Sequence, residues 1–464
     1  MKYISTRGDA PTVSFEQALL AGLAPDGGLY MPESWPQFSE NEIRSMAGKP
    51  FAEIAKTVLM QFIGDTFSEE ELLDLSNQAF ASFSHPATTP LVQIDDDDWI
   101  LELFHGPTLA FKDVAMQLLG VMFERVLGRK KKNLTIIGAT SGDTGGAAIE
   151  ALKNKERVNV YILHPKGRIS AVQRRIMTTS GANNITNIAV DGTFDDCQAI
   201  VKTLFGDREF AQKVALGGVN SINWARIAIQ CVYYFTAATS LGAPERACSF
   251  VVPTGNFGDI FAGFVARQMG LPIRTLCAAT NQNDIVHRVL ETGAYSPTEV
   301  SATSSPSMDI QVASNFERLI FEAAQRDSDK VRSLMNAQKQ SGQFTLDQDC
   351  RNFLSPLFTS NMASEVETAQ CMQYHFDNAG LLIDPHTAVG RVVAQKERAK
   401  GHLSGPVVTL ATAHPAKFPE SVVAATGQSP ALPTSLADLH ERKEDITDAP
   451  ADSAAIRSLI LDNY

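Results

Sequence analysis

The stretch "ACSFVVPTGNFGDIFAGFVARQMG", Ala247 to Gly270, decides the fold that the sequence predicts. Its first part, residues 248–253, is largely apolar without regular polar alternation, which is typical of a strand covered on both faces of a sheet. A turn with two glycines follows, and then an apolar segment that is long enough for a helix. Strand, loop and helix in this order form the unit of a parallel sheet whose connections are helices.

The same order recurs along the chain. Residues 133–138, "NLTIIG", come before the loop "ATSGDTGG" and the helical "AAIEALKN", and further strand-like segments follow. We therefore predict an α/β fold with mostly parallel sheets. A chain of 464 residues is too long for one ordinary core. We expect an N-terminal domain, two α/β regions and a tail that packs on the body, over 1–90, 91–235, 236–430 and 431–464.

The composition argues against several classes of protein. A net charge of −12 disfavours nucleic acid as the main partner. No segment resembles a signal peptide, and the longest apolar stretch, residues 227–243, contains polar side chains that suit a buried helix better than a membrane span. The six cysteines have no CxxC spacing and no histidine cluster beside them, which favours reduced thiols over disulfides or a metal site. We expect a cytoplasmic protein, and the acidic charge does not exclude a small anionic ligand, because local loops can be positive.

The loop "TGNFGD", residues 254–259, has the chemistry of a phosphate cup. Gly255 and Gly258 allow the backbone to turn so that successive N–H groups converge, and the next helix adds its positive N-terminus. Asp259 can cap that helix. A plain turn with a helix cap remains the alternative.

Two further loops follow predicted strands. "GATSGDTGG", residues 138–146, carries the hydroxyls of Thr140, Ser141 and Thr144, which suit a carboxylate or a second phosphate, although the same residue types also cap helices. "ATAHPAKF", residues 411–418, places the hydroxyl of Thr412 over a strand end. Lys417 in this loop is a rival for any reactive lysine, but we expect it to be solvated because prolines flank it.

Lys112, in "HGPTLAFKD", has unusual neighbours for a lysine. It begins a predicted helix beside Leu109 and Phe111, and both the helix N-terminus and the apolar surroundings lower the pKa of an ammonium group. A lysine needs a lowered pKa to attack a carbonyl. Together with the phosphate cup and the hydroxyl-rich loop, such a lysine fits pyridoxal 5'-phosphate bound as a Schiff base. An ordinary surface lysine remains the alternative.

Seven motifs in order resemble the threonine synthase family of fold type II pyridoxal-phosphate enzymes, and the similarity covers nearly the whole chain. They are "HGPTLAFKD", "ATSGDTG", "NSINWARI", "PTGNFGD", "SPSMDIQVASNFER", "DPHTAVG" and "ATAHPAKF". The resemblance implies a fold like that of the tryptophan synthase β subunit, with two domains and an N-terminal domain. It also implies a lyase of threonine biosynthesis that converts O-phospho-L-homoserine and water to L-threonine and phosphate.

The resemblance also implies roles for residues. Lys112 carries the cofactor, the loop Gly255, Asn256, Phe257 and Gly258 holds its phosphate, and Thr412 bonds the pyridine nitrogen. Asp143 stands where relatives with "SGN" bring an asparagine near the cofactor. The carboxylate and the phosphate of the substrate both need donors, and the candidates are Thr140, Ser141, Thr144, Arg168, Ser221, Asn223 and Arg226.

Two other readings stay open from the sequence. One keeps the fold and cofactor but changes the reaction to that of a serine or threonine dehydratase or a β-replacement enzyme. The other is a non-catalytic homologue that binds phosphorylated ligands. The oligomeric state is expected to be a monomer or a homodimer.

Overall fold

The structure is a computed structural model that describes residues 1–140, 142–218 and 221–462. The N-terminal part contains an antiparallel sheet in the order β2-β1-β3, formed by β2 (Val13–Ser14), β1 (Lys2–Ser5) and β3 (Tyr30–Pro32). Its helices are α1 (Phe15–Ala21), α2 (Glu40–Met46), α3 (Phe51–Ile63) and α4 (Glu69–Phe80). Ser14 and Ser39 precede α1 and α2 and form capping boxes, in which the N–H of the third helical residue and the N–H of the serine both find side-chain acceptors.

A six-stranded sheet forms the larger α/β part, in the order β14-β11-β10-β15-β5-β4. Its strands are β14 (Phe358–Met362), β11 (Ile273–Thr280), β10 (Cys248–Pro253), β15 (Val407–Ala411), β5 (Asp98–Glu102) and β4 (Leu91–Asp95). All neighbours run parallel except β4, which is antiparallel to β5. The parallel central strands are buried, as expected for a sheet with helices on both faces.

Helices and short strands surround this sheet. α17 (Pro385–Ala399) contacts β10, β11, β14 and β15, while α10 (Trp224–Ser240) packs against α11 (Gly258–Gln268). The other elements of this part are α12 (Ile285–Thr292), β12 (Ala294–Tyr295), η1 (Pro306–Met308), α13 (Phe316–Ala323), α14 (Ser328–Ser341), β13 (Phe344–Thr345), α15 (Gln348–Leu354), α16 (Glu365–Ala379), η2 (Pro415–Lys417) and α18 (Pro419–Thr426).

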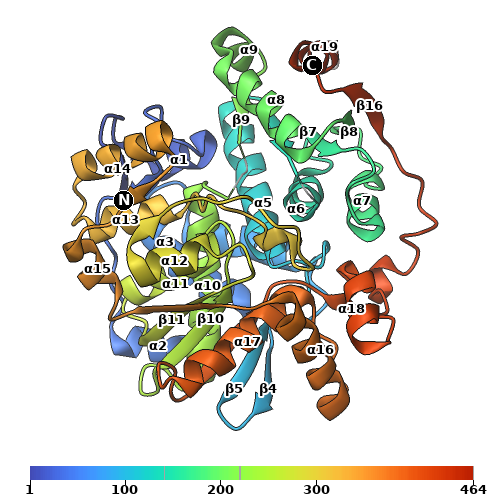
Figure 1. The fold of residues 1–464 in the computed structure, drawn as a ribbon. Coiled ribbons are helices and arrows are strands. Elements are labelled where there is room, and N and C mark those ends of the chain that lie inside the picture. Colours follow the sequence, from blue (N-terminus) through green and yellow to red (C-terminus); the bar gives the residue numbers. More distant parts are fainter. Residues whose placement is uncertain (141, 219–220, 463–464) are drawn as a thin grey trace.

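A five-stranded parallel sheet forms the second α/β part, in the order β16-β8-β7-β6-β9. Its strands are β16 (Thr447–Pro450), β8 (Ile185–Asp191), β7 (Val158–Pro165), β6 (Leu134–Ala139) and β9 (Leu216–Gly217). Its helices are α5 (Lys112–Lys130), α6 (Asp143–Leu152), α7 (Ala171–Thr178), α8 (Phe194–Gly206), α9 (Arg208–Lys213) and α19 (Ser453–Asp462). Figure 1 shows this part at the upper right, above the larger sheet.

The expected α/β class with mostly parallel sheets is confirmed. The chain crosses between the sheets more than once, because β4 and β5 belong to the larger sheet and β6 to β9 to the smaller one. After α18 the chain passes through η3 (Thr434–Leu436), returns to the smaller sheet and adds β16 beside β8. Within the described residues, no helix combines the length and the apolar character that crossing a bilayer requires.

Candidate active site

The loop before Lys112 is tied to the loop after β15. Phe111 N–H donates to the carbonyl of Thr412 at 2.9 Å, and His414 N–H donates to the carbonyl of Leu109 at 3.0 Å. Leu109 has a φ of +60°, which turns the chain into α5. Lys112, the first residue of α5, therefore lies close to the end of β15.

Asp143, at the start of α6, receives four polar side chains. Its Oδ2 is 3.3 Å from Nζ of Lys112, and Ser307 Oγ donates to the same oxygen at 2.7 Å. Its Oδ1 is 2.6 Å from Nζ of Lys417 and accepts from Nε2 of Gln173 at 2.9 Å. Lys112, Lys417, Ser307 and Gln173 thus meet at one buried carboxylate.

The pKa values of Lys112 and Asp143 are both lowered, for different physical reasons. Burial lowers the pKa of Lys112, and the positive charges of Lys417 and Arg226 lower it further, while Asp143 works in the opposite direction. Burial alone would raise the pKa of Asp143, but the charges of Lys112 and Lys417 and the hydrogen bonds from Lys417 and Ser307 together hold it well below its ordinary value. The site therefore favours an ionised Asp143 and eases the loss of a proton from Lys112.

The expectation that Lys417 is solvated was wrong. Its exposed fraction is 1%, and it is the last residue of the turn η2, which begins at Pro415. The side chain of His414 stabilises this turn by accepting a hydrogen bond from the N–H of Ala416 at 3.1 Å. The flanking prolines therefore do not expose Lys417, whose ammonium group pairs with Asp143.

The loop after β10 has open backbone donors. Phe257 has a φ of +64° and precedes α11 without a side-chain cap, so the start of this helix is left to an external acceptor. In residues 1–140, 142–218 and 221–462, no group accepts a hydrogen bond from the N–H groups of residues 255–258. A Cβ at Gly255 would lie 2.7 Å from the carbonyl oxygen of Ser307, which explains why glycine is needed there. These features fit a phosphate group.

Neighbouring residues hold this loop in place. Asn315 accounts for two of the contacts, since its N–H and its Nδ2 both donate to the carbonyl of Asn256 at 3.1 Å. The ring of Phe257 packs edge-on against Phe316 with 5.1 Å between centroids. Asp259 does not cap α11, because its carboxylate accepts hydrogen bonds from the hydroxyls of Tyr233 and Tyr234 instead.

Thr412 follows β15 directly and is 5% exposed. Its carbonyl is used by Phe111, but its hydroxyl makes no hydrogen bond to another described residue. A free hydroxyl at the carboxyl end of a central strand is available to a ligand.

The hydroxyl-rich loop of residues 138–146 is partly committed to its own helix. Thr140 Oγ1 accepts from the N–H groups of Gly142 at 3.0 Å and Gly145 at 2.9 Å, which is the capping role left open as an alternative. Thr144 is half-buried on the first turn of α6. Ser141 lies outside the described residues.

The other candidate donors fall into two groups. Arg226 is buried on α10, its pKa is lowered to about 10 by burial, and its charge acts on Lys112. Ser221 precedes α10, and Asn223 caps it while also donating to the carbonyl of Leu19 at 2.8 Å. Arg168 is exposed after β7 and near Asp196, and the structure does not bring it together with the other candidates.

Sequence reasoning assigned no role to Gln173, Ser307 or His386. The N–H of Ser307 donates to Nε2 of His386 at 3.3 Å, and Nδ1 of His386 lies 2.8 Å from Asp384. Ser307 and His386 belong to the motifs "SPSMD" and "DPHTAVG", whose sequences alone do not show that the two residues contact each other. These contacts position the Ser307 hydroxyl that bonds Asp143.

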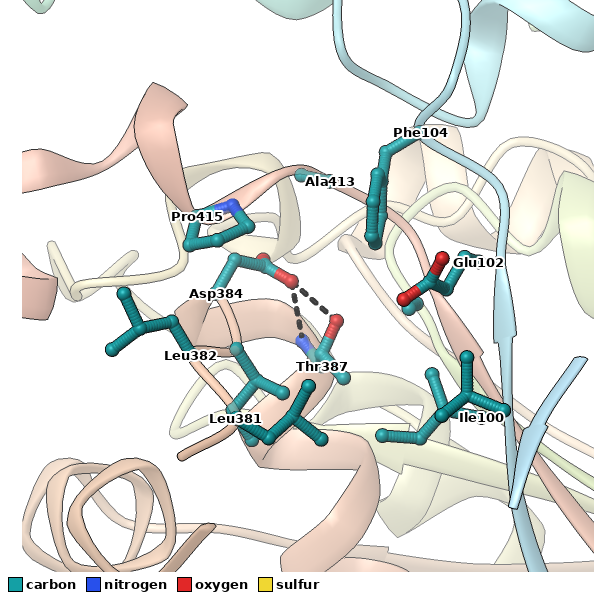
Figure 2. A pocket seen from close by; sticks show the side chains of 12 residues that line it. Ile100, Glu102, Phe104, Leu381, Leu382, Asp384, Thr387, Ala413 and Pro415 are labelled. Carbon is teal, nitrogen blue, oxygen red and sulfur yellow. Dashed lines mark hydrogen bonds between the residues drawn. The ribbon is translucent and has the colours of Figure 1, made fainter. Parts of the chain in front are cut away.

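A small cavity lies behind the end of β15 (Figure 2). Its volume is about 10 Å³, which is enough for about one water molecule. Ala411 and Ala413 line it but Thr412 does not, and alternation along an extended chain then points Thr412 to the other side. Figure 2 shows Asp384 bonded to the N–H and hydroxyl of Thr387, so its carboxylate is occupied. This cavity is separate from the Lys112 site.

Comparison with protein families matches almost the whole chain. Residues 2–80 match the model described as "Threonine synthase N terminus", residues 83–357 the model "Pyridoxal-phosphate dependent enzyme", and residues 387–460 the model "Threonine synthase, C-terminal". A threonine synthase of Pseudomonas aeruginosa is 48% identical over 99% of this chain and 98% of its own length.

Solved structures agree with this match. A pyridoxal-phosphate-bound threonine synthase from Brucella melitensis has a TM-score of 0.97 and 52% identity, and the similarity covers 100% of this chain and 99% of that one. Threonine synthase from yeast has a TM-score of 0.94 and 40% identity over 100% of this chain and 98% of that one.

Proposed function

Because the chain belongs to the threonine synthase family of pyridoxal-phosphate-dependent enzymes, we propose that it converts O-phospho-L-homoserine and water to L-threonine and phosphate. The observation that carries this proposal is that three features meet at the carboxyl ends of three neighbouring strands of the larger sheet. Lys112 follows β5, the open N–H groups of residues 255–258 follow β10, and Thr412 follows β15. Since these strands are neighbours in the larger sheet, their carboxyl ends converge where ligands bind in α/β folds.

The residues fit pyridoxal 5'-phosphate, which is the cofactor of this family. Lys112 would hold it covalently, Gly255, Asn256, Phe257 and Gly258 would hold its phosphate through backbone N–H groups, and Thr412 would bond its ring nitrogen. When bound, the cofactor supplies an electron sink for the negative charge left by loss of a proton. The basic side chains of Lys112 and Lys417 share the single carboxylate of Asp143, which further favours an anionic ligand here.

The side chain of Lys112 supplies the base. Because burial lowers its pKa, Nζ gives up its own proton more readily than an exposed lysine and can then accept one from the α-carbon of the substrate. Asp143, 3.3 Å away, orients Nζ, and the flexible stem of a lysine allows the same atom to reach the neighbouring β-carbon. Nζ releases the first proton before it takes one from the β-carbon, and the γ-phosphate then leaves. Protons return to the γ-carbon and the α-carbon, and water adds its hydroxyl group at the β-carbon while its other proton goes to the released phosphate.

The substrate carries a carboxylate and a phosphate, and both need donors. We assign these contacts to the hydroxyls of Thr140, Ser141 and Thr144 and to the region of Ser221, Asn223 and Arg226. Arg226 is the member whose buried charge acts on Lys112. Asn223 also fixes the start of α10, so its loss would affect the fold as well as binding. Arg168 remains a candidate only if the exposed turn after β7 moves toward the site.

The proposal also covers setting and assembly. The six cysteines are free and buried, which supports a reducing location such as the cytoplasm. The proposed assembly is a monomer or a homodimer, and the proposed partner is the small-molecule substrate.

The test combines phosphate release with reductive trapping. The purified chain should show a visible cofactor band, release phosphate from O-phospho-L-homoserine, and carry the pyridoxyl label on Lys112 after borohydride reduction. Lys112→Ala should lose the band, the label and at least about a thousandfold of the activity, because it removes both the covalent link and the base. Lys400→Ala, whose partner is Glu397 far from Lys112 in the fold, is the control.

Other outcomes would change the assignment. Deamination of serine or threonine without phosphate release would favour the dehydratase reading. A chain that stays colourless with pyridoxal phosphate would favour the non-catalytic reading. A label on Lys417 would contradict the role given to Lys112.

A further inference from the structure

Lys417 is a second buried lysine at the site, and the proposed reaction gives it no role. Its exposed fraction is 1%, and its Nζ is 2.6 Å from Oδ1 of Asp143. Lys112 is 3.3 Å from Oδ2 of the same carboxylate. Of the two lysines, Lys417 makes the shorter contact with Asp143.

The backbone around Lys417 holds it in this place. Lys417 ends the turn η2, and its N–H donates to the carbonyl of His414 at 3.0 Å. The next residue, Phe418, packs its ring against His386 with 4.8 Å between centroids. His386 in turn accepts from the N–H of Ser307, whose hydroxyl bonds Asp143. Lys417 and Ser307 are thus fixed on opposite oxygens of Asp143 by one connected set of contacts.

A shared carboxylate has a consequence when one lysine loses its charge. If Lys112 becomes neutral to act as nucleophile or base, Asp143 loses one cationic partner in a buried place where a lone charge is costly. Lys417 keeps a cationic partner on the carboxylate at that moment. With Lys417 beside it, the negative charge of Asp143 is compensated even when Lys112 is neutral, so Asp143 raises the pKa of Lys112 less than it would alone.

We propose that Lys417 is a positioning residue for Lys112, acting through the carboxylate of Asp143 that the two lysines share. This inference rests on the proposed role of Lys112 as the lysine that holds the cofactor. Lys417 does not react itself, but keeps Asp143 ionised and directed so that Lys112 is held in place as a neutral amine.

The direction of the effect follows from the charges that face Lys112. These are Asp143 on α6, Lys417 on η2 and Arg226 on α10, while Asp113 on its own helix bonds Thr108. Removing the charge of Lys417 takes away a repulsion and leaves Asp143 to act on Lys112 alone. Both changes favour a protonated Lys112. Removing the charge of Asp143 has the opposite effect.

The experiment uses the full-length chain stripped of cofactor and then mixed with pyridoxal 5'-phosphate. The rate at which the visible band appears is followed from about pH 6 to about pH 10, a range that brackets a lowered lysine pKa. Lys417→Met should move the rise of this rate to higher pH by about one unit, so that capture near pH 7 slows roughly tenfold. Asp143→Asn should move the rise to lower pH, and Lys417→Arg should stay close to the parent.

A second readout does not depend on the cofactor. Competitive acylation of the cofactor-free chain, read by mass spectrometry on the peptide that contains Lys112, should show the same shifts. Lys155→Met is the matched control. Lys155 lies away from the site, and its Nζ is 2.6 Å from Oε2 of Glu124, the same distance as in the Lys417–Asp143 pair. It should leave both profiles unchanged.

The outcomes separate this inference from the proposed function. If the parent chain forms no visible band, the proposed function fails. If the parent forms it but Lys417→Met leaves the profile unmoved, or moves it to lower pH, the role given to Lys417 is wrong. The same holds if Lys417→Met and Asp143→Asn shift the profile in one direction, as a merely structural role would. If Lys417→Met does not fold, the other two variants still test the inference. It is wrong if Lys417→Arg captures the cofactor more slowly than the parent, or if Asp143→Asn moves the profile to higher pH.

Discussion

Asp259, next to the proposed phosphate loop of residues 255–258, shows how burial alters the charge of a carboxyl group. Asp259, in the first turn of α11, is buried, and desolvation raises its pKa to about 7 against the hydrogen bonds from Tyr233 and Tyr234. Its Oδ2 is buried without a hydrogen-bond partner among the described residues. A proton on this carboxyl therefore avoids a negative charge close to the loop that is proposed to hold a phosphate.

The raised pKa of Asp259 predicts a pH-dependent stability. The unfolded chain releases this proton above its ordinary pKa of 3.8, whereas the folded chain keeps it up to about 7. The folded state thus binds more protons in this window, so its stability falls as pH rises from about 4 to about 7. Asp259→Asn keeps an acceptor for Tyr233 and removes this fall. We expect the free energy of unfolding in urea, measured for the variant minus the parent, to increase by ~2 kcal/mol between about pH 5 and about pH 7.5.

The control for this prediction removes one negative charge elsewhere. Asp65 is exposed, and Asp65→Asn should follow the parent over the same pH range. If Asp259→Asn and the parent lose stability in parallel, then Asp259 is already ionised in the folded chain and the prediction is wrong.

The residues predictable from sequence are those whose signal is local. The apolar neighbours of Lys112 and the glycines of residues 255–258 stand next to one another in the chain, so their chemistry could be read directly. The burial of Lys417 could not, because it depends on Asp143 on another element. Ser307 reaches Asp143 across 164 positions, a contact that no local pattern encodes. The roles given to the substrate donors stay predictions.

At the scale of elements, the contact between α5 and α6 sets the distance between Lys112 and Asp143. Both residues begin their helices, and the helices approach so closely that a Cβ at Gly120 would lie 2.3 Å from the carbonyl oxygen of Ala151. A backbone atom cannot yield like the end of a side chain. The sequence predicted which segments are strands and which are helices. It did not predict the close contact of α5 with α6 or the pairing of β5 with β15, because these contacts join segments far apart in the chain.

Gly120→Ala should therefore push the two helices apart. The gain in helix propensity is about 1 kcal/mol, but overpacking costs typically 1–3 kcal/mol, and here it meets backbone. We expect a net loss in stability in urea unfolding and slower cofactor capture, because the Lys112–Asp143 contact lengthens. Gly128→Ala on the same helix meets no heavy atom within 4 Å and should be neutral or stabilising. Equal behaviour of both variants would show that the helices have room to spare.

At the scale of the whole molecule, the C-terminal segment joins the two α/β parts. It leaves α18 beside the larger sheet, runs along the outside of the molecule and ends on the smaller sheet (Figure 1). Glu444 pairs with Arg174 at 2.8 Å, and the N–H of Asp445 donates to the carbonyl of Thr178 at 2.7 Å, so α7 anchors the segment on its way. The proposed active-site residues come from both parts, and this segment links the two parts along the outside of the molecule.

The final helix predicts which part of the molecule loosens first. Ile456 and Ile460 of α19 are fully buried in the same cluster as Ile200 and Leu204 of α8. Ile456→Ala should cost about 2–5 kcal/mol, and the loss should be confined to the smaller sheet because the cluster belongs to it. Hydrogen exchange followed by mass spectrometry should speed up in β8, β16, α8 and α19 while β10 and β15 keep the parent rates. Ser458→Ala, at an exposed position of the same helix, is the control. Faster exchange in β10 and β15 as well would mean that the two sheets unfold as one unit, and the segment would then be part of a single cooperative core.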